Sequence, residues 1–201
     1  GRTFSTACRA AVKRLLASQI QKLSLARRGN LRRIARVPRP ANAQIVEGGT
    51  FTRSVVFSDP GTDVWTALLD YGDGSGTQTL TLTDRLLPLE HGYADSGIYS
   101  VTARLSDGDG GVVTDSFTVT VANVAPTIAL AGAAFGSEGT PYTLLLGPVT
   151  DPGSDTVSQY LVGWGDGGVV ETVTTAGPVT HTYAADGVRT IVVALRDEDG
   201  I

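Results

Sequence analysis

The sequence predicts an all-β protein in which two tandem antiparallel β-sandwiches follow a basic N-terminal α-helix. Three observations lead to this prediction: an internal repeat of about ninety residues, short stretches in which apolar and polar residues alternate, and a high content of glycine, threonine and valine after residue 50. Alternation with a period of two is typical of half-buried strands. Several such strands separated by glycine- and aspartate-rich turns favour antiparallel sandwiches.

Four motifs define the repeat, and each recurs at an offset of 90 to 93 residues. A constant offset of this size indicates an array of similar domains. We therefore predict one domain over residues 30–123 and a second over residues 124–201. The motif pairs are Asp59-Pro60-Gly61-Thr62-Asp63 with Asp151-Pro152-Gly153-Ser154-Asp155, Tyr71-Gly72-Asp73-Gly74 with Trp164-Gly165-Asp166-Gly167, His91-Gly92-Tyr93 with His181-Thr182-Tyr183, and Asp107-Gly108-Asp109-Gly110 with Asp197-Glu198-Asp199-Gly200.

Residues 1–29 have apolar residues at helical spacing and predict a basic amphipathic helix. Residues 1–40 contain eleven Arg and Lys and no acid, whereas residues 41–201 contain five Arg and twenty acids. This asymmetry is compatible with a solvated linker or anchoring helix, with a helix that binds a membrane surface or an anionic polymer, and with a nucleic-acid contact. Aromatic residues are not interleaved with the arginines, so we expect no nucleic-acid binding. No apolar run is long enough to span a membrane.

The alternating stretches identify the core strands of both repeats. The second repeat has no counterpart to the last strand of the first, so we expect this strand to lie beyond the given sequence or to come from another molecule by strand addition. The apolar faces are Trp65, Ala67, Leu69 and Tyr71, then Tyr99, Val101, Ala103 and Leu105, then Phe117, Val119 and Val121 in the first repeat, and Tyr160, Val162 and Trp164, then Ile191, Val193 and Leu195 in the second.

The motifs resemble those of PKD domains, the immunoglobulin-like β-sandwiches named for the polycystic kidney disease protein. The shared pattern is an aromatic strand that enters Gly-Asp-Gly, then His-x-Tyr, then Gly-x-Tyr-x-Val at Gly97 to Val101, then an acidic turn. The resemblance covers residues from about 43 to 201. It implies two immunoglobulin-like sandwiches of the kind common in bacterial surface and secreted proteins, and hence an extracellular or cell-surface location.

The resemblance also implies calcium sites, because some bacterial PKD domains bind Ca²⁺ through a linker asparagine and aspartates of two loops. Three carboxylates with an amide and backbone carbonyls match the hard oxygen ligands that Ca²⁺ prefers. The alternative is that these aspartates only bind backbone amides within glycine turns. The matching residues are Asp59, Asp63, Asp107 and Asn30 in the first repeat, and Asp151, Asp155, Asp197 and Asn123 in the second.

Other reactive residues favour structural roles. We expect Asp73 and Asp166 to stabilise their turns, and His91 and His181 to be packed and hydrogen-bonded at a corner of each sandwich. The sequence lacks Gly-x-Ser-x-Gly, and the only cysteine, Cys8, lies in the basic segment with no histidine near it. We therefore expect no catalytic site and no enzyme activity.

The sequence as a whole predicts a structural or adhesive module of a larger extracellular protein from a bacterium. Its expected partners are neighbouring modules, other copies of the protein, or cell-surface polysaccharide. One alternative is a subunit of an extracellular filament or surface layer, assembled through the basic helix and strand complementation. Another is a polysaccharide-binding accessory module of a secreted hydrolase.

Overall fold

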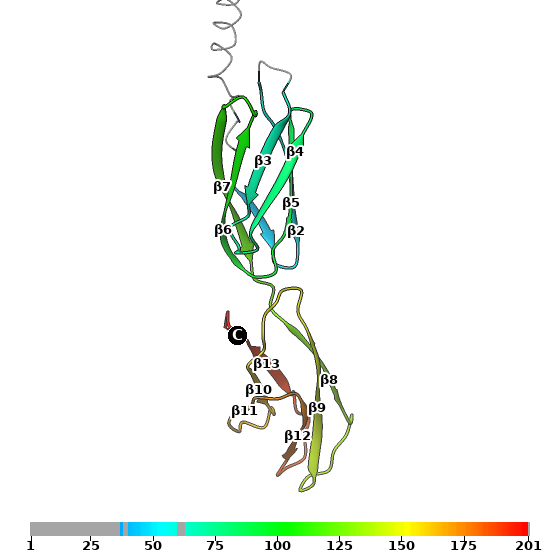
Figure 1. Cartoon of the computed structure of the whole chain (residues 1–201). Coiled ribbons are helices and arrows are strands. Elements are labelled where there is room, and N and C mark those ends of the chain that lie inside the picture. The colour runs from blue at the N-terminus through cyan, green and yellow to red at the C-terminus, as the bar shows by residue number, and fades with distance from the viewer. Residues whose placement is uncertain (1–36, 38–39, 60–62, 201) are drawn as a thin grey trace, which may run out of the picture. The chain divides into compact units, whose positions relative to one another are not determined.

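A computed structural model describes residues 37, 40–59 and 63–200, and every regular element within them is a β-strand (Figure 1). The all-β prediction is therefore confirmed for these residues. The predicted basic helix and Asn30 lie outside the described residues. The described part of the chain contains no helix long and apolar enough to cross a membrane. The strands are β1 (Ala43–Val46), β2 (Thr50–Val56), β3 (Trp65–Asp70), β4 (Thr77–Leu82), β5 (Leu86–Gly92), β6 (Gly97–Ser106), β7 (Val112–Ala122), β8 (Thr127–Gly132), β9 (Pro141–Thr150), β10 (Gln159–Gly163), β11 (Glu171–Val173), β12 (Gly177–Thr182) and β13 (Val192–Arg196).

The strands of the first repeat form two sheets. The larger has the order β1-β7-β6-β3-β4, and β2 and β5 form the second. Strand β3 pairs antiparallel with β4 on one edge, where Trp65 lies opposite Leu82, and with β6 on the other, where Leu69 lies opposite Ala103. This is the antiparallel arrangement that the alternating residues predict.

The strands of the second repeat form two three-stranded sheets, ordered β11-β10-β13 and β12-β9-β8. Strand β10 pairs antiparallel with both β11 and β13. Strand β9 pairs antiparallel with β12 and β8, and the register with β8 shifts between Ile128 and Leu130.

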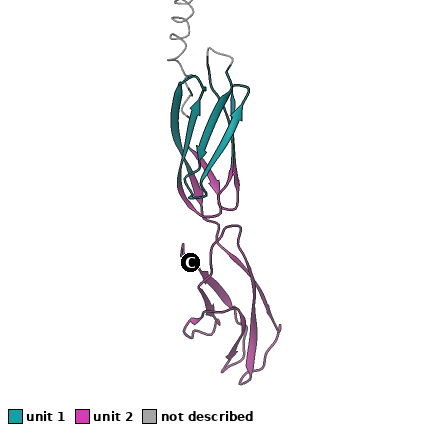
Figure 2. Ribbon diagram, in the orientation of Figure 1, with its two compact units in different colours: residues 1–42, 52–90, 99–119 teal, residues 43–51, 91–98, 120–201 magenta. Residues whose placement is uncertain are grey.

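Contacts between residues divide the chain into two compact units (Figure 2). Unit 1 contains residues 52–90 and 99–119, together with the described residues up to Asn42. Unit 2 contains Ala43–Phe51, His91–Ile98 and the chain from Thr120 onwards, and so combines two segments of the first repeat with the second repeat. The predicted domain boundaries at residues 30 and 123 stay predictions.

The predicted apolar faces lie in the core. In β3 and directly after it, Trp65, Ala67, Leu69 and Tyr71 are at most 3% exposed. In unit 2, residues from both sheets of the second repeat form one buried cluster, which consists of Leu144, Leu146, Tyr160, Val162, Trp164 and Leu195. Burial of alternate residues fixes the register of each strand, because a shift by one residue would turn the apolar face to solvent.

Candidate metal centre

Four carboxylates come together in unit 2, and each offers one oxygen to a group whose atoms all lie within 4.8 Å of one another. Glu47 directly follows β1, and Asp95 lies between β5 and β6. Asp155 lies between β9 and β10, and Asp199 follows β13. The group, called the carboxylate cluster here, thus draws two residues from each sequence repeat. Negative charges at this spacing repel one another unless a cation or protons lie among them.

Glu47 is the buried member of the carboxylate cluster. The residue is 1% exposed. Its Oε1 accepts a hydrogen bond from the backbone N–H of Val124, whereas its Oε2 is buried and has no hydrogen-bond partner. A buried carboxylate oxygen without a partner is costly. A bound cation would supply the missing partner.

Two glycines allow the loop after β9 to cover Glu47. A Cβ atom at Gly153 would lie 2.8 Å from Cδ of Glu47, and a Cβ atom at Gly48 would lie 2.1 Å from the carbonyl oxygen of Pro152. Gly48 also has a φ of +67°, which disfavours any residue with a side chain. The close approach of this loop therefore depends on glycine at both positions.

Asp155 lies beside Glu47, and both of its carboxylate oxygens are buried without a hydrogen-bond partner. Burial raises the pKa of Asp155, and the negative charges of Glu47, Asp151, Glu198 and Asp199 act in the same direction, so that together they bring it to about 6. Both causes disfavour the charged form of the carboxylate, and a cation bound among these groups would favour it.

Asn123 takes part in the centre by orienting one of its carboxylates. Its Nδ2 donates a hydrogen bond of 2.7 Å to Oδ2 of Asp199, and the hydroxyl of Ser96 donates to the same oxygen at 3.1 Å. Hydrogen bonds of this kind hold a metal ligand in one orientation. The structure therefore places the predicted linker asparagine at the site, with its amide group bound to a candidate ligand.

The other two predicted residues of the second repeat bind backbone amides. Asp151 Oδ1 accepts from Gly153 N at 2.6 Å, and its buried Oδ2 has no partner. Asp197 Oδ1 accepts from Asp199 N at 3.0 Å and from Gly200 N at 2.9 Å. Asp197 therefore stabilises the turn that presents Asp199, which is the turn role left open by the sequence.

Three of the residues predicted in the first repeat, Asp59, Asp63 and Asp107, lie in unit 1, outside the carboxylate cluster. Asp59 accepts a hydrogen bond of 2.9 Å from Nε1 of Trp65, and Asp107 Oδ1 accepts from two amides of its own turn, those of Asp109 and Gly111. Burial raises the pKa of Asp63, and the charges of Asp59, Asp109 and Asp107 add to this effect. The negative charges of Asp59, Asp107 and Asp109 thus raise the pKa of Asp63, but a metal site built from these carboxylates stays a prediction.

Sequence reasoning missed three members of the cluster, Glu47, Asp95 and Asp199. A signal existed for two of them: Glu47-Gly48 recurs as Glu138-Gly139, and Asp199 belongs to the repeated acidic turn. Asp95 has no acidic counterpart at the expected offset, where Ala185 stands. Only folding shows that these residues meet.

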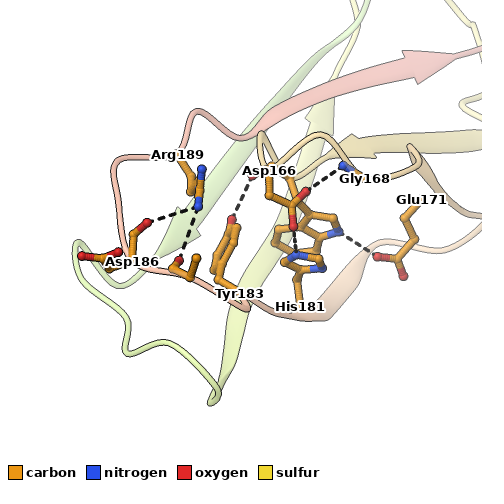
Figure 3. Close-up of polar contacts among 9 residues, drawn as sticks. Asp166, Gly168, Glu171, His181, Tyr183, Asp186 and Arg189 are labelled. Atoms are coloured by element: carbon orange, nitrogen blue, oxygen red, sulfur yellow. Dashed lines mark hydrogen bonds and ion pairs between the residues drawn. The ribbon is translucent and has the colours of Figure 1, made fainter.

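The Gly-Asp-Gly motif of the second repeat has a structural role (Figure 3). Asp166 Oδ1 accepts from Gly168 N at 3.1 Å, and Asp166 Oδ2 lies 2.7 Å from Nε2 of His181. The hydrogen bond with His181 lowers the pKa of Asp166. The ring of His181 stacks on Trp164 with the centroids 4.9 Å apart. The predicted turn role of Asp166 and the predicted packed histidine are both confirmed here. In the first repeat, the N–H and the hydroxyl of Ser75 likewise donate hydrogen bonds to Oδ1 of Asp73.

Comparison with solved structures gives distant similarities. No curated protein matches the sequence. The fibronectin(III)-like modules of Clostridium thermocellum CbhA are 18% identical, with 83% of this chain and 87% of theirs aligned and a TM-score of 0.36. The PKD domain of an M14-like peptidase from a Thermoplasmatales archaeon is 25% identical, with 44% of this chain and 92% of that chain aligned and a TM-score of 0.35. SGBP-B of Bacteroides ovatus, in complex with a mixed-linkage heptasaccharide, is 18% identical, with 85% of this chain and 42% of that chain aligned and a TM-score of 0.33.

One family model matches part of the chain, and the matched part is the first repeat. Residues 37–121 match the model of the PKD domain, and they include the Gly-Asp-Gly, His-x-Tyr and acidic-turn motifs of the first repeat. The described strands of that repeat form two sheets, one of five strands and one of two. The first repeat therefore matches the PKD domain in sequence, and its described strands form the two sheets expected of an immunoglobulin-like β-sandwich.

Proposed function

We propose that this chain is a structural module of a larger extracellular protein, and that Ca²⁺ bound by the carboxylate cluster ties its two repeats together. The observation that carries the proposal is the buried Oε2 of Glu47, which has no partner although its side chain belongs to a group of four carboxylates. The PKD domain supports an extracellular module, because the family is common in surface and secreted proteins. The proposed role is mechanical and adhesive, without catalysis.

The donor set favours Ca²⁺ over other common ions. The cluster offers carboxylate oxygens from four separate segments, and Ca²⁺ takes six to eight oxygen ligands in flexible geometry. Zn²⁺ prefers sulfur and nitrogen ligands, and neither histidine belongs to the cluster. Mg²⁺ requires near-octahedral geometry and keeps several waters. Backbone carbonyls and water would complete the shell of a Ca²⁺ ion.

The test is a calcium titration with a matched pair of variants. Calorimetry on the wild-type protein should show a saturable site, and chelator should lower its melting temperature. Asp155→Asn should abolish most of both effects, because it removes a charged ligand. Asp63→Asn is the matched control, since Asp63 has the same place in the motif of the first repeat. A calcium response that Asp63→Asn abolishes and Asp155→Asn leaves intact would refute the proposed site.

We expect neighbouring modules or other copies of the protein to be the main partners. Polysaccharide binding has less support, because Trp65 and Trp164 are 3% and 4% exposed and offer no stacking surface to a sugar. A glycan array with the wild-type protein would check this expectation. Retention of a defined oligosaccharide would favour the accessory-module alternative.

A further inference from the structure

Unit 2 holds more buried carboxylate oxygens than a single ion in the carboxylate cluster would satisfy. In the described part of the chain, four buried carboxylate oxygens have no hydrogen-bond partner: Oε2 of Glu47, Oδ2 of Asp151 and both oxygens of Asp155. An ion in the cluster would take one oxygen from each of its four residues, which include Glu47 and Asp155 but not Asp151. One oxygen of Asp155 and Oδ2 of Asp151 would then stay buried without a partner, which is costly.

The first repeat shows how this aspartate can be satisfied without a metal. Asp151 is the counterpart of Asp59 in the repeated Asp-Pro-Gly motif. Oδ2 of Asp59 accepts a hydrogen bond of 2.9 Å from Nε1 of Trp65, six residues later. Six residues after Asp151 stands Val157, which has no donor in its side chain and packs against the apolar cluster. The second repeat therefore lacks the indole that serves its counterpart, and Oδ2 of Asp151 needs another partner.

Asp151 and Asp155 line the same cavity, which has a volume of about 470 Å³ and leaves room for a cation with bound water. Hydrogen bonds fix the backbone of the loop between them. The N–H of Gly153 donates to Oδ1 of Asp151 at 2.6 Å, and the N–H of Thr156 donates to Oε2 of Glu198 at 2.8 Å. Because Oδ1 of Asp151 is used within the loop, Oδ2 is the oxygen that can bind a cation.

The cavity adjoins the carboxylate cluster. A Cβ atom at Gly153 would lie 2.8 Å from Cδ of Glu47 and 3.1 Å from Oδ1 of Asp151, so both carboxylates lie against this glycine. Glu47 is 1% exposed. Together with Asp151, the four residues of the cluster carry five negative charges when ionised. One Ca²⁺ ion leaves three of these charges uncompensated, whereas two ions leave one. Uncompensated like charges repel strongly where water is excluded.

We propose that unit 2 binds a second Ca²⁺ ion beside the carboxylate cluster, between Asp151 and Asp155, and that the carboxylate of Asp155 bridges the two ions with one oxygen on each. The inference rests on the proposed calcium site and adds an ion with a ligand of its own, Oδ2 of Asp151. Ser154 and Thr156 line the same cavity. Their hydroxyls, backbone carbonyls and water can complete the shell of six to eight oxygens that Ca²⁺ takes.

The test counts the calcium ions bound to the whole protein by equilibrium dialysis. Asp151→Asn should bind one ion fewer than the wild-type protein, because asparagine keeps the oxygen that accepts from Gly153 and loses the charged ligand. Asp151→Ser, which also keeps an acceptor without a carboxylate, should give the same loss. Asp155→Asn should bind two ions fewer, because it removes the bridge. Any calcium held by the first repeat is common to these proteins and does not affect the differences.

Asp186→Asn is the matched control for net charge, because Asp186 is an exposed acid of the same unit outside the cluster. It should bind as many ions as the wild-type protein. Circular dichroism in chelator checks that each variant is folded.

The possible failures are distinguishable. A full complement of ions in Asp151→Asn and Asp151→Ser would overturn the second ion, and so would the loss of only one ion in Asp155→Asn, which leaves the carboxylate cluster as a site for one ion. If Asp155→Asn loses no ion, the calcium site of the proposed function fails as well. Loss of an ion in Asp186→Asn would show that net charge, and not these ligands, holds the calcium, and would also overturn the second ion.

Discussion

Replacing Glu47 with glutamine should change the melting temperature by an amount that depends on whether calcium is present. Glutamine keeps the oxygen that accepts from Val124 and removes the charge from a residue that is 1% exposed. Its amide group would donate to the neighbouring carboxylates. An unsatisfied buried polar group costs about 1 to 3 kcal/mol. In chelator, the variant should therefore melt about 2 to 12 °C higher than the wild-type protein.

Calcium should act in the opposite direction. At a free calcium concentration of about one hundred times Kd, the wild-type protein gains about 2.7 kcal/mol of stability. The variant has lost one charged ligand and gains much less. Its advantage should thus fall by about 2 kcal/mol, or about 4 to 8 °C in melting temperature.

The assay is thermal unfolding followed by circular dichroism, with each protein measured in chelator and in calcium. Glu138→Gln is the matched control, because Glu138 is the counterpart of Glu47 but is exposed. The difference in melting temperature between Glu138→Gln and the wild-type protein should be the same in chelator and in calcium. If the melting temperature of Glu47→Gln differs from that of the wild-type protein by the same amount in chelator and in calcium, Glu47 is not a calcium ligand.

Three further predictions follow from contacts elsewhere. Asp107→Ala should lower stability by about 1 to 2 kcal/mol with or without calcium, because Asp107 binds two amides of its turn; a calcium-dependent loss would instead support the metal site predicted for the first repeat. Gly48→Ala should destabilise the protein by at least about 1 kcal/mol more than Gly139→Ala. Both glycines have a positive φ, but a Cβ atom at Gly48 would collide with the backbone of Pro152, whereas a Cβ atom at Gly139 would lie in open space. Equal losses of unfolding free energy in chemical denaturation would contradict this prediction. The hydrogen bond with His181 lowers the pKa of Asp166 below the unfolded value of about 3.9, so this aspartate stabilises the fold above that pH and the stabilisation is lost as the pH falls through the folded pKa. Asp166→Asn should therefore reduce the loss of folding stability between pH 5 and 2. An unchanged dependence of stability on pH in this range would count against the Asp166–His181 pair.

Much of the fold could be predicted from local patterns. The alternation of Trp65, Ala67 and Leu69 fixes which face of β3 is buried, because burial selects one register. The repeated motifs located the turns of both repeats. The pairing of β8 with β9 was not predicted, because alternation identifies a strand and its buried face but not the strand that it pairs with.

The candidate site was predicted only in part. Asp155 and Asn123 were identified through their motifs, and both lie at the carboxylate cluster. The sequence could not show that Glu47 and Asp95 join them, because long-range contacts place these residues beside Asp155. Asp197 was expected as a ligand, yet it binds the amides of its own turn. The side chain of Asp197 binds the amides of its turn, and Asp199, two residues later in the same turn, reaches the cluster.

The carboxylate cluster can also be considered as a cross-link. Its four residues are separated along the chain by between about 44 and 60 residues, so one ion would close three long loops of the unfolded chain. In the chain-entropy model, a covalent bond that closes one loop of this length contributes on the order of 4 kcal/mol. The only cysteine is Cys8, so neither repeat contains a disulfide. A calcium ion would give this chain a reversible staple, one that forms where calcium is plentiful and opens where it is scarce.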